Sequence, residues 1–564
     1  MEKQKNRSKF NRCCLIFTGI LLIVVTYTPV KSFSWWKSLF IQEKILNHLQ
    51  ANAKNQTSTN SSDHNKLSDS NESLDHYPSG AENNSNLGSK DHFGLSYKNK
   101  LDNQNKAIVK TTPREIKNNS TNEKINEKLD KELNDKELNI EEHPGKKLLE
   151  GKSFILPAWK ASAYKNIWKV WGLNKKPIDF EKQFRERYGL HEAPYPNNNL
   201  PMGLRYNQFL LINGISVDCM VCHSGSIFGK SYVGMGNSTG DVHALFEELT
   251  AADNRNPRLP FRFSTTRGTS EAAAMAVYLL RFRDSDLNFT REHPLPLKVN
   301  DDLCEDVPAW WLLKKKKTMY YTAGASARSV RSKMQFMMTP LTSRDQFVKA
   351  EKDFQAISDY LMTLQAPKYP LPINSELANK GKKLFVEHCA KCHGTYDDNW
   401  TYPNKIIPID EIGTDRRRYE GIPVEFVHYY NKSWFAKERT GWFLDGDVSM
   451  VSKGYQAPPL DGLWATAPYL HNGSVPTVYE VLRSNKRPKI FTRSYQTAET
   501  DYDPIKMGWK YQKLSADYIK PTAPIEARKI YDTRQSGHSN QGHTYGDDLS
   551  ENEVMELIEY LKTL

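Results

Sequence analysis

Cysteine is scarce in this chain, with seven in 564 residues. A domain held together by disulfides needs a much higher density of cysteine, so a disulfide scaffold is excluded. The excess of one sign of charge over the other is also small, because the chain has 78 lysine and arginine residues and 66 aspartate and glutamate residues. The formal net charge of +12 is mild for this length. It favours soluble surfaces and acidic partners, and we expect no nucleic-acid partner.

Long hydrophobic runs are almost absent, and the 38% of hydrophobic residues exclude a multi-spanning membrane protein. The exception is the stretch 13–30, which follows a basic N-terminus. This is the secretory pattern, although the run is short for a membrane span of about 20 residues. Residues 1–32 are therefore expected to be a signal peptide, cleaved after Ser32, or a retained membrane anchor. Either way we expect an exported protein, periplasmic or extracellular, with membrane contact only through this segment.

The next stretch, 33–147, has few large apolar residues and is crowded with Asn, Ser, Lys, Asp and Glu. Such a composition cannot bury enough surface to offset chain entropy, so we expect a disordered linker. Aromatic and periodic apolar positions begin near residue 148. The remaining chain is long enough for two domains with cores of their own, which we place at 148–366 and 367–564.

Four of the seven cysteines form two C-x-x-C-H motifs, Cys219–Cys222–His223 and Cys389–Cys392–His393. This spacing is typical of covalent haem c attachment. Each thiol adds to one haem vinyl group, and the adjacent histidine lies below the ring, where it can bind iron. A structural zinc site would favour two pairs close in sequence, and a redox dithiol needs no following histidine. We therefore predict two haem c groups; an additional calcium ion stays open.

Helical segments surround the two motifs in a similar order. The segment 379–394 reads as an amphipathic helix that carries the second motif, and the chain ends in a helix capped by Ser550. The first half ends in a comparable helix at 343–364, and "DYLMTL" and "EYLKTL" close the two halves. A helix with the haem motif packed against a C-terminal helix is the cytochrome c plan. We predict a mainly α fold with two cytochrome c-like domains and large loop insertions.

The segment "APPLDGLWATAPYLHNGSVPTVYEVL" (457–482) resembles the C-terminal signature of the di-haem cytochrome c peroxidase superfamily, in its rubber-oxygenase-like branch. The stretches "DVPAWWLLKKKKTMYY" (306–321) and "NQGHTYGDDLS" (540–550) are similar to the same branch. This resemblance implies a haem-dependent oxidoreductase that is peroxidase-like or uses dioxygen. It does not carry the exact reaction, because one fold hosts several activities.

The sixth iron ligand decides the role of each haem, since a second His or Met gives a low-spin electron-transfer haem. For the second haem the candidates are His543, His471 and Met450. The resemblance implies two histidines at this haem and favours His543 in its glycine-rich loop, with His471 as the alternative. We expect His538 to be exposed.

The first haem has no obvious sixth ligand, as a reactive open site would require. His243 and Met235 are weak candidates. The resemblance implies substrate or dioxygen chemistry there, with aromatic residues on the distal side. Phe261 and Phe263 are candidates for that pocket, although core packing explains them as well, and it is also the expectation for three methionines: Met334, Met337 and Met338.

Trp310 and Trp311 lie between the two motifs in sequence. In the peroxidase superfamily a tryptophan between the haems supports electron transfer, and packing between domains is the alternative. The basic run 314–317 is a solvated face or a guide for an acidic redox partner. Two functions remain open. One is an enzyme that uses a small-molecule oxidant or substrate and a redox partner protein, and the large loops favour it. The other is a di-haem electron carrier.

Overall fold

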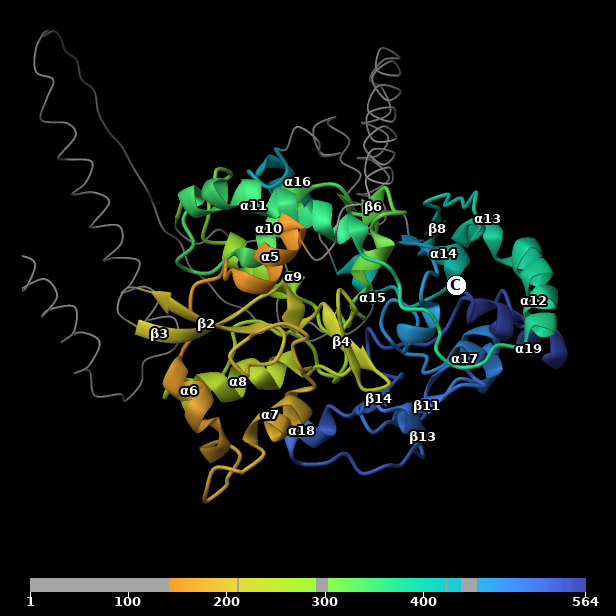
Figure 1. Ribbon diagram of the computed structural model, residues 1–564, viewed down its shortest axis with the longest axis horizontal. Helices are drawn as coiled ribbons and strands as arrows, with labels where there is room; N and C mark the ends of the chain where they lie inside the picture. Colours follow the sequence, from red (N-terminus) through yellow and green to blue (C-terminus); the bar gives the residue numbers. More distant parts are fainter. Residues whose placement is uncertain (1–141, 210–211, 291–302, 422–423, 438–453) are drawn as a thin grey trace, which may run out of the picture. The chain divides into compact units, whose positions relative to one another are not determined.

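The computed structural model describes residues 142–209, 212–290, 303–421, 424–437 and 454–564 (Figure 1). These residues belong to one compact unit. The predicted signal or anchor, and the predicted linker up to residue 141, lie outside the described residues. Within the described ranges, no helix has the length and apolar character that crossing a membrane requires. The first described helix, α5 (Pro144–Gly151), begins before the predicted domain start at 148.

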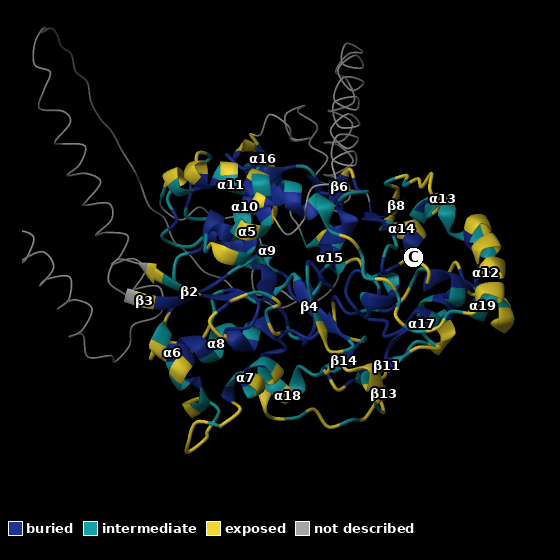
Figure 2. Cartoon of the chain, in the orientation of Figure 1, coloured by how far each residue is buried: buried dark blue, intermediate teal, exposed yellow. Residues whose placement is uncertain are grey.

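The second haem motif sits on a pair of helices in the C-terminal half. Helix α12 (Ser375–His388) packs against α19 (Glu551–Leu561). Ser550 is the N-cap of α19, as predicted, and forms a capping box with Glu553. Gly381 allows the close approach, because a Cβ there would lie 1.9 Å from the carbonyl oxygen of Glu556. Exposed residues line the outer side of both helices (Figure 2).

A second helix pair has the same kind of contact in the N-terminal half. Helix α5 packs against α11 (Arg344–Thr363), which Ser343 and Gln346 cap. A Cβ at Gly145 would lie 1.9 Å from the carbonyl oxygen of Ala356. Here, however, the haem motif does not follow the first helix. The intervening elements are β1 (Trp159–Lys160), α6 (Ala161–Asn166), α7 (Phe180–Tyr188), β2 (Leu204–Phe209) and β3 (Ile212–Val217).

Strands are more frequent than the prediction of a mainly α fold allowed, and the described chain mixes helices with small antiparallel sheets. The order β1-β3-β2 forms one sheet, with Trp159 opposite Ile215 and Leu204 opposite Val217. A second has the order β13-β10-β14, from Gln512–Lys513, Ile490–Thr492 and Ile530–Asp532. The two-stranded sheets pair β4 (Ser224–Ile227) with β5 (Lys230–Val233), β6 (Thr318–Met319) with β7 (Ala325–Ser326), β8 (Ile406–Pro408) with β9 (Gly454–Gln456), and β11 (Tyr502–Asp503) with β12 (Gly508–Trp509).

The remaining helices are short and lie between these elements. They are α8 (Val242–Ala252), α9 (Ala273–Leu280), α10 (Val330–Met334), α13 (Ala390–His393), α14 (Ile409–Ile412), α15 (Arg417–Glu420), α16 (Val424–Lys432), α17 (Val478–Leu482) and α18 (Pro524–Ala527).

The hydrophobic cores cross the boundary that we predicted between 366 and 367. The cluster around Leu245 and Phe347 in the first half includes Phe435 from the second. The cluster around Phe385 in the second half includes Trp311 from the first. The two halves therefore share their cores, and a division into two haem domains stays a prediction.

Candidate haem-attachment sites

The first motif forms a tight turn directly after strand β3. Asp218 caps the 3₁₀ turn Cys219–Val221 by accepting a hydrogen bond from the Met220 amide at 2.8 Å. Arg205 holds Asp218 in place with an Nε–Oδ2 distance of 2.5 Å. The His223 amide donates to the Cys219 carbonyl at 3.0 Å, so both thiols and the imidazole lie within one turn of the chain.

The two cysteines of the first motif are free and half-buried. Burial raises the pKa of Cys219 to about 12, and Asp218 adds to the shift. Burial likewise raises the pKa of Cys222 to about 11. Both cysteines are therefore neutral thiols at pH 7, available for addition to a vinyl group.

His223 lies against Trp310, with ring centroids 4.7 Å apart and planes at 22°. Burial lowers the pKa of His223 to about 4, and the Pro308 carbonyl partly offsets this. The ring is thus neutral, as a metal ligand must be. Among the described residues no imidazole faces His223, and Trp310 is the ring that contacts it.

The second motif continues a long helix instead. Helix α12 runs into Cys389, and α13 carries Cys392 and His393, whose amide donates to the Cys389 carbonyl at 3.0 Å. Burial raises the pKa of Cys389 to about 11. His393 Nδ1 lies 2.8 Å from the Pro458 carbonyl oxygen, which fixes the tautomer with the proton on Nδ1. Nε2 is then left to bind iron.

His543 faces His393, with ring centroids 6.4 Å apart. Two metal–nitrogen bonds of about 2 Å and two ring radii of about 1 Å together span about 6 Å, so the gap has the size that one metal atom requires. The Nδ1 atom of His543 is buried without a hydrogen-bond partner. Burial lowers the pKa of His543 to about 4, helped by the neighbouring His393 and Arg487. These residues fit a haem iron held between two histidines.

The loop that carries His543 is held by one buried guanidinium. Arg487 donates to the carbonyl oxygens of Asn540, Gly542 and His543 at 2.6, 2.7 and 3.0 Å. It also donates to the carbonyls of Glu480 and Val481. His543 itself has a positive φ of 48°. Gly542 passes so close to Gly413 that a Cβ would lie 2.2 Å from its carbonyl carbon.

His471, the alternative ligand, lies in other surroundings. Its ring stacks on Tyr455 at 4.2 Å and meets the edge of Tyr321 at 6.2 Å, and no ring contact joins it to His393. Burial lowers the pKa of His471 to about 3, and Nε2 has no hydrogen-bond partner. Met450 falls outside the described residues.

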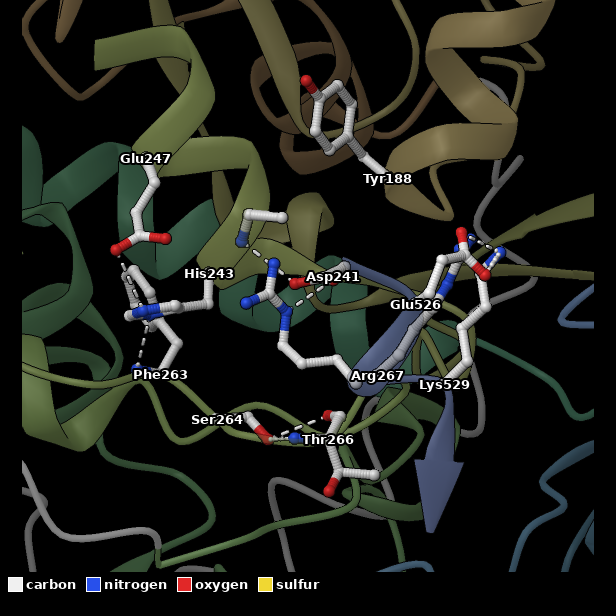
Figure 3. A network of polar contacts seen from close by, with 12 residues as sticks. Tyr188, Asp241, His243, Glu247, Phe263, Ser264, Thr266, Arg267, Glu526 and Lys529 are labelled. Carbon is white, nitrogen blue, oxygen red and sulfur yellow. Dashed lines mark hydrogen bonds and ion pairs between the residues drawn. The ribbon is translucent and has the colours of Figure 1, made fainter. Parts of the chain in front are cut away.

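Two histidines that we considered are engaged elsewhere. His243 Nε2 lies 3.4 Å from Glu247, and the Phe263 amide donates to its Nδ1 at 3.5 Å (Figure 3). The expectation of an exposed His538 is wrong: the residue is fully buried. Its Nε2 lies 3.0 Å from the Thr266 hydroxyl, and its Nδ1 lies 2.9 Å from the Ser536 carbonyl.

The residues suggested for a pocket at the first haem are core residues in this structure. Phe261 and Phe263 meet edge to face at 5.1 Å in the N-terminal cluster. As expected, the three methionines Met334, Met337 and Met338 are buried in the same cluster. Met235 belongs to the other large cluster.

The basic run 314–317 is only partly a solvated face. Lys315 forms an ion pair with Asp461 at 2.8 Å, with its side chain 6% exposed. Lys316 is buried, and burial lowers its pKa to about 8. These two lysines are therefore engaged within the protein. They do not belong to a solvated basic face that could guide an acidic redox partner protein.

Trp310 and Trp311 connect the two motifs. Trp310 lies on His223, and the Trp311 indole donates to the Asp461 carbonyl at 2.9 Å. Asp461 ends the segment 458–461, which begins with the carbonyl that faces His393. The Tyr396 hydroxyl donates to the His393 carbonyl at 2.9 Å and accepts from the Leu460 amide at 2.5 Å. A short bridge of rings and hydrogen bonds thus joins the two predicted iron ligands.

Several residues of these sites were missed by the sequence reasoning. Pro458 lies inside the recognised 457–482 signature, but its contact with His393 leaves no local pattern. Arg487 stands in an ordinary basic stretch. Arg418 is buried between Glu271 and Glu305, at 2.7 and 3.0 Å. No group of three or more His, Cys, Asp or Glu side chains that could hold a metal ion occurs in the described part of the chain.

The class of protein whose chemistry these sites fit is the c-type cytochrome, because covalent haem attachment requires a pair of free cysteines followed by a neutral histidine. The comparisons agree. Residues 454–492 match the family described as "RoxA-like, cytochrome c-like". This segment includes Pro458 and Asp461, and a cytochrome c-like domain implies haem c.

Two curated relatives come from Sinorhizobium fredii. The uncharacterized protein y4iM is 29% identical over 245 residues, which cover 37% of this chain and 53% of that protein. The uncharacterized protein y4iJ is 28% identical over 262 residues, covering 36% of this chain and 41% of that protein. The chain thus spans about half the length of the curated relatives that it matches.

Proposed function

We propose that the protein is a di-haem c-type cytochrome that acts as an oxidoreductase. The C-terminal motif holds an electron-transfer haem, and the N-terminal motif holds the haem at which a small oxidant or substrate reacts. The observation that carries this proposal is the contrast between the two histidines: His543 faces His393 at 6.4 Å, whereas Trp310 is the described ring that contacts His223. When bound, haem supplies one-electron redox chemistry and a binding position for peroxide or dioxygen.

At the C-terminal site each residue has a separate task. Cys389 and Cys392 form the thioethers, and His393 binds through Nε2 while its Nδ1–H donates to Pro458. This hydrogen bond raises the basicity of the ligand and fixes the ring orientation. His543 would supply the second histidine for a haem held here, and Arg487 holds its loop. With two histidines to hold it, such a haem would exchange electrons and would not bind substrate.

At the N-terminal site, Cys219 and Cys222 would form the thioethers and His223 would bind the iron. Among the described residues no second histidine faces this ring, so a haem held here would have room to bind a small oxidant or substrate. Trp310 fixes the plane of His223 by stacking on it.

Electrons pass between the sites along the bridge of Trp310, Trp311 and the segment 458–461. The route leaves the covalent chain at three points, which are the His223–Trp310 stack, the Trp311–Asp461 hydrogen bond and the Pro458–His393 hydrogen bond. An external redox partner protein supplies or removes the electrons. We also propose export to the periplasm or beyond, because covalent haem attachment takes place outside the cytoplasm.

Holoprotein mass spectrometry tests the two haems directly. Protein expressed with the haem c maturation machinery is expected to carry two haem additions. Cys222→Ala and Cys392→Ala are each expected to lose haem at the altered motif only, and the double variant should lose both. A wild-type mass without two haem additions, or no loss in the double variant, would overturn the proposal.

Turnover assays then separate the reactions. We expect the loaded protein to consume peroxide or to cleave a polyisoprene with dioxygen, and to lose that activity in Cys222→Ala. A protein with two haems and neither activity would be an electron carrier, which is the alternative function. Cell fractionation and the N-terminal mass of the mature protein test the proposed export.

A further inference from the structure

Two buried arginines lie against one tyrosine ring near the first haem motif. The guanidinium of Arg493 lies 4.4 Å from the ring centroid of Tyr495, and that of Arg267 lies 5.1 Å from it. Arg493 is 9% exposed and Arg267 is 4% exposed. Tyr495 has a positive φ of 55°, a conformation that side chains other than glycine rarely adopt.

Neither arginine has a carboxylate partner among the described residues. Arg267 donates to the backbone carbonyls of Thr239 and Glu186 at 2.8 and 2.7 Å. Arg493 donates to the Ser238 carbonyl, and its Nη1 atom is buried with no hydrogen-bond partner. Two cations are thus buried together, and the hydrogen bonds of their guanidinium groups go to backbone oxygens, which is costly unless an anion joins them.

The acidic groups nearby are already engaged. Asp241, which lies beside Arg267 in Figure 3, caps helix α8 through the Ala244 amide at 3.0 Å and pairs with Arg528 at 2.8 Å. Asp306 acts on Arg493 without a hydrogen bond. Burial and the neighbouring Glu305 raise the pKa of Asp306, and the Tyr321 hydroxyl donates to its Oδ2 at 3.5 Å.

Arg418 is a buried arginine in the same chain whose positive charge is compensated by two carboxylates. Glu271 and Glu305 lie 2.7 and 3.0 Å from its Nε atom, and together they raise its pKa above the usual value despite burial. Arg493 has the opposite response, because burial lowers its pKa to about 10. The two arginines differ in the anion that each has beside it.

The segments around this pair also touch the first haem motif. The Asn237 amide donates to the Cys222 carbonyl at 2.8 Å, and the next residue, Ser238, accepts from Arg493. Gly268 lies over Ser238, since a Cβ there would be 2.2 Å from the Ser238 carbonyl oxygen and 3.5 Å from Arg493 Nη2. The Ser270 hydroxyl lies 3.6 Å from the Cys222 sulfur.

We propose that Arg493 and Arg267 form a carboxylate-binding site beside the first motif. The carboxylate comes either from a propionate of the haem attached at Cys219 and Cys222 or from a free small anion. The first source rests on the proposed function, and the second does not. Arg493 offers the unused donor, and Arg267, which lies against the same Tyr495 ring, adds positive charge.

The test compares Arg493→Gln and Arg493→Lys with the wild-type holoprotein. Arg283→Gln is the matched control. Arg283 is also buried and donates to the backbone carbonyls of Leu287, Thr342 and Thr339, and its guanidinium lies 4.4 Å from the Phe289 ring centroid. The readouts are the haem mass, the reduction potential of each haem by spectroscopic titration, and the melting temperature with added sodium acetate or inorganic phosphate.

If a propionate is bound, Arg493→Gln should lower the potential of the first haem, because the oxidised centre loses a neighbouring positive charge. Arg493→Lys should restore most of it, and the second haem should not move. If a free anion is bound, acetate or phosphate should raise the melting temperature of the wild type and of Arg283→Gln, but not of Arg493→Gln. An Arg493→Gln protein with an unchanged potential and the same anion response as the wild type would overturn the proposal.

A wild-type mass without haem at the first motif would overturn the proposed function. The anion arm of the test would still decide whether the site exists. The two failures are therefore distinguishable.

Discussion

The two C-x-x-C-H motifs have the same residue pattern and are built into the chain in different ways. The first follows a strand, is capped by Asp218 and has its histidine stacked on Trp310. The second continues helix α12 and has its histidine facing His543. The motif thus determines how a haem is attached, while the residues brought in from distant parts of the chain determine what that haem can do.

The difference also lies in how each site is supported. At the second site three separate segments contribute. Pro458 and His543 contact His393, and Arg487 holds the loop that carries His543. At the first site, Trp310 contacts His223, and Asn237 and Ser270 contact Cys222. A site with both axial positions filled by protein suits electron transfer, and a site with one position left suits chemistry.

The largest expected effect is the loss of the histidine that faces His393. His543→Ala should convert the second haem from a low-spin to a high-spin or water-bound form, because one strong axial ligand is removed. Absorption and resonance Raman spectra of the ferric protein measure this change. His471→Ala is the matched control and should leave both haem spectra unchanged. The reverse pattern would assign the ligand to His471.

Stability should respond strongly where helices approach closely. Gly381→Ala and Gly145→Ala each place a Cβ 1.9 Å from a backbone oxygen of the partner helix. We expect each to lower the free energy of unfolding by about 3 kcal/mol, the upper range for overpacking. Thermal and denaturant unfolding measure the loss.

Gly151→Ala is the control for these variants, since a Cβ at this position would have no atom within 4 Å. It should be neutral or stabilising by about 0.5 kcal/mol, because alanine favours the helix. Equal losses at all three positions would contradict the proposed close packing.

A smaller effect is expected from the guanidinium that holds the His543 loop. Arg487→Met removes donors to five carbonyls, so we expect a mixture of low-spin and high-spin second haem and a loss of about 2 kcal/mol of stability. Arg487→Lys should keep part of the low-spin signal. If Arg487→Met lost stability with a fully low-spin spectrum, the residue would be structural only.

The smallest expected effect concerns the bridge between the sites. Trp311→Phe removes the indole donor to Asp461 and should slow electron transfer between the haems several-fold while leaving both spectra intact. Flash photolysis or stopped-flow reduction measures the rate. Trp159→Phe, which also removes a buried indole donor (to Thr250 at 3.0 Å), should not change it. Equal rates in the two variants would exclude Trp311 from the route.

Local signals made part of this structure predictable. The two motifs, the Ser550 cap and the burial of Met334 follow from spacing and periodicity within a short window. The mixed fold was missed because strands such as β6 and β11 have two residues each, too short for an alternating pattern. A run such as 314–317 gives no sign that Lys315 reaches Asp461.

Distant contacts explain the remaining differences. The burial of His538 depends on Thr266, which lies far away in sequence. Whether a carboxylate pairs with Arg493 depends on which acidic residues the fold brings near it. The preference for His543 over His471 came from a resemblance, and only the spatial contact with His393 gives a physical reason for it.

Low-temperature EPR of the oxidised holoprotein tests the central claim, that the two sites differ in their sixth ligand. The account predicts one low-spin signal, lost in Cys392→Ala, and one high-spin signal, lost in Cys222→Ala. Two low-spin signals in the oxidised protein, with the signal of the first motif still low-spin after one electron has reduced the other haem, would contradict it and would make the protein an electron carrier.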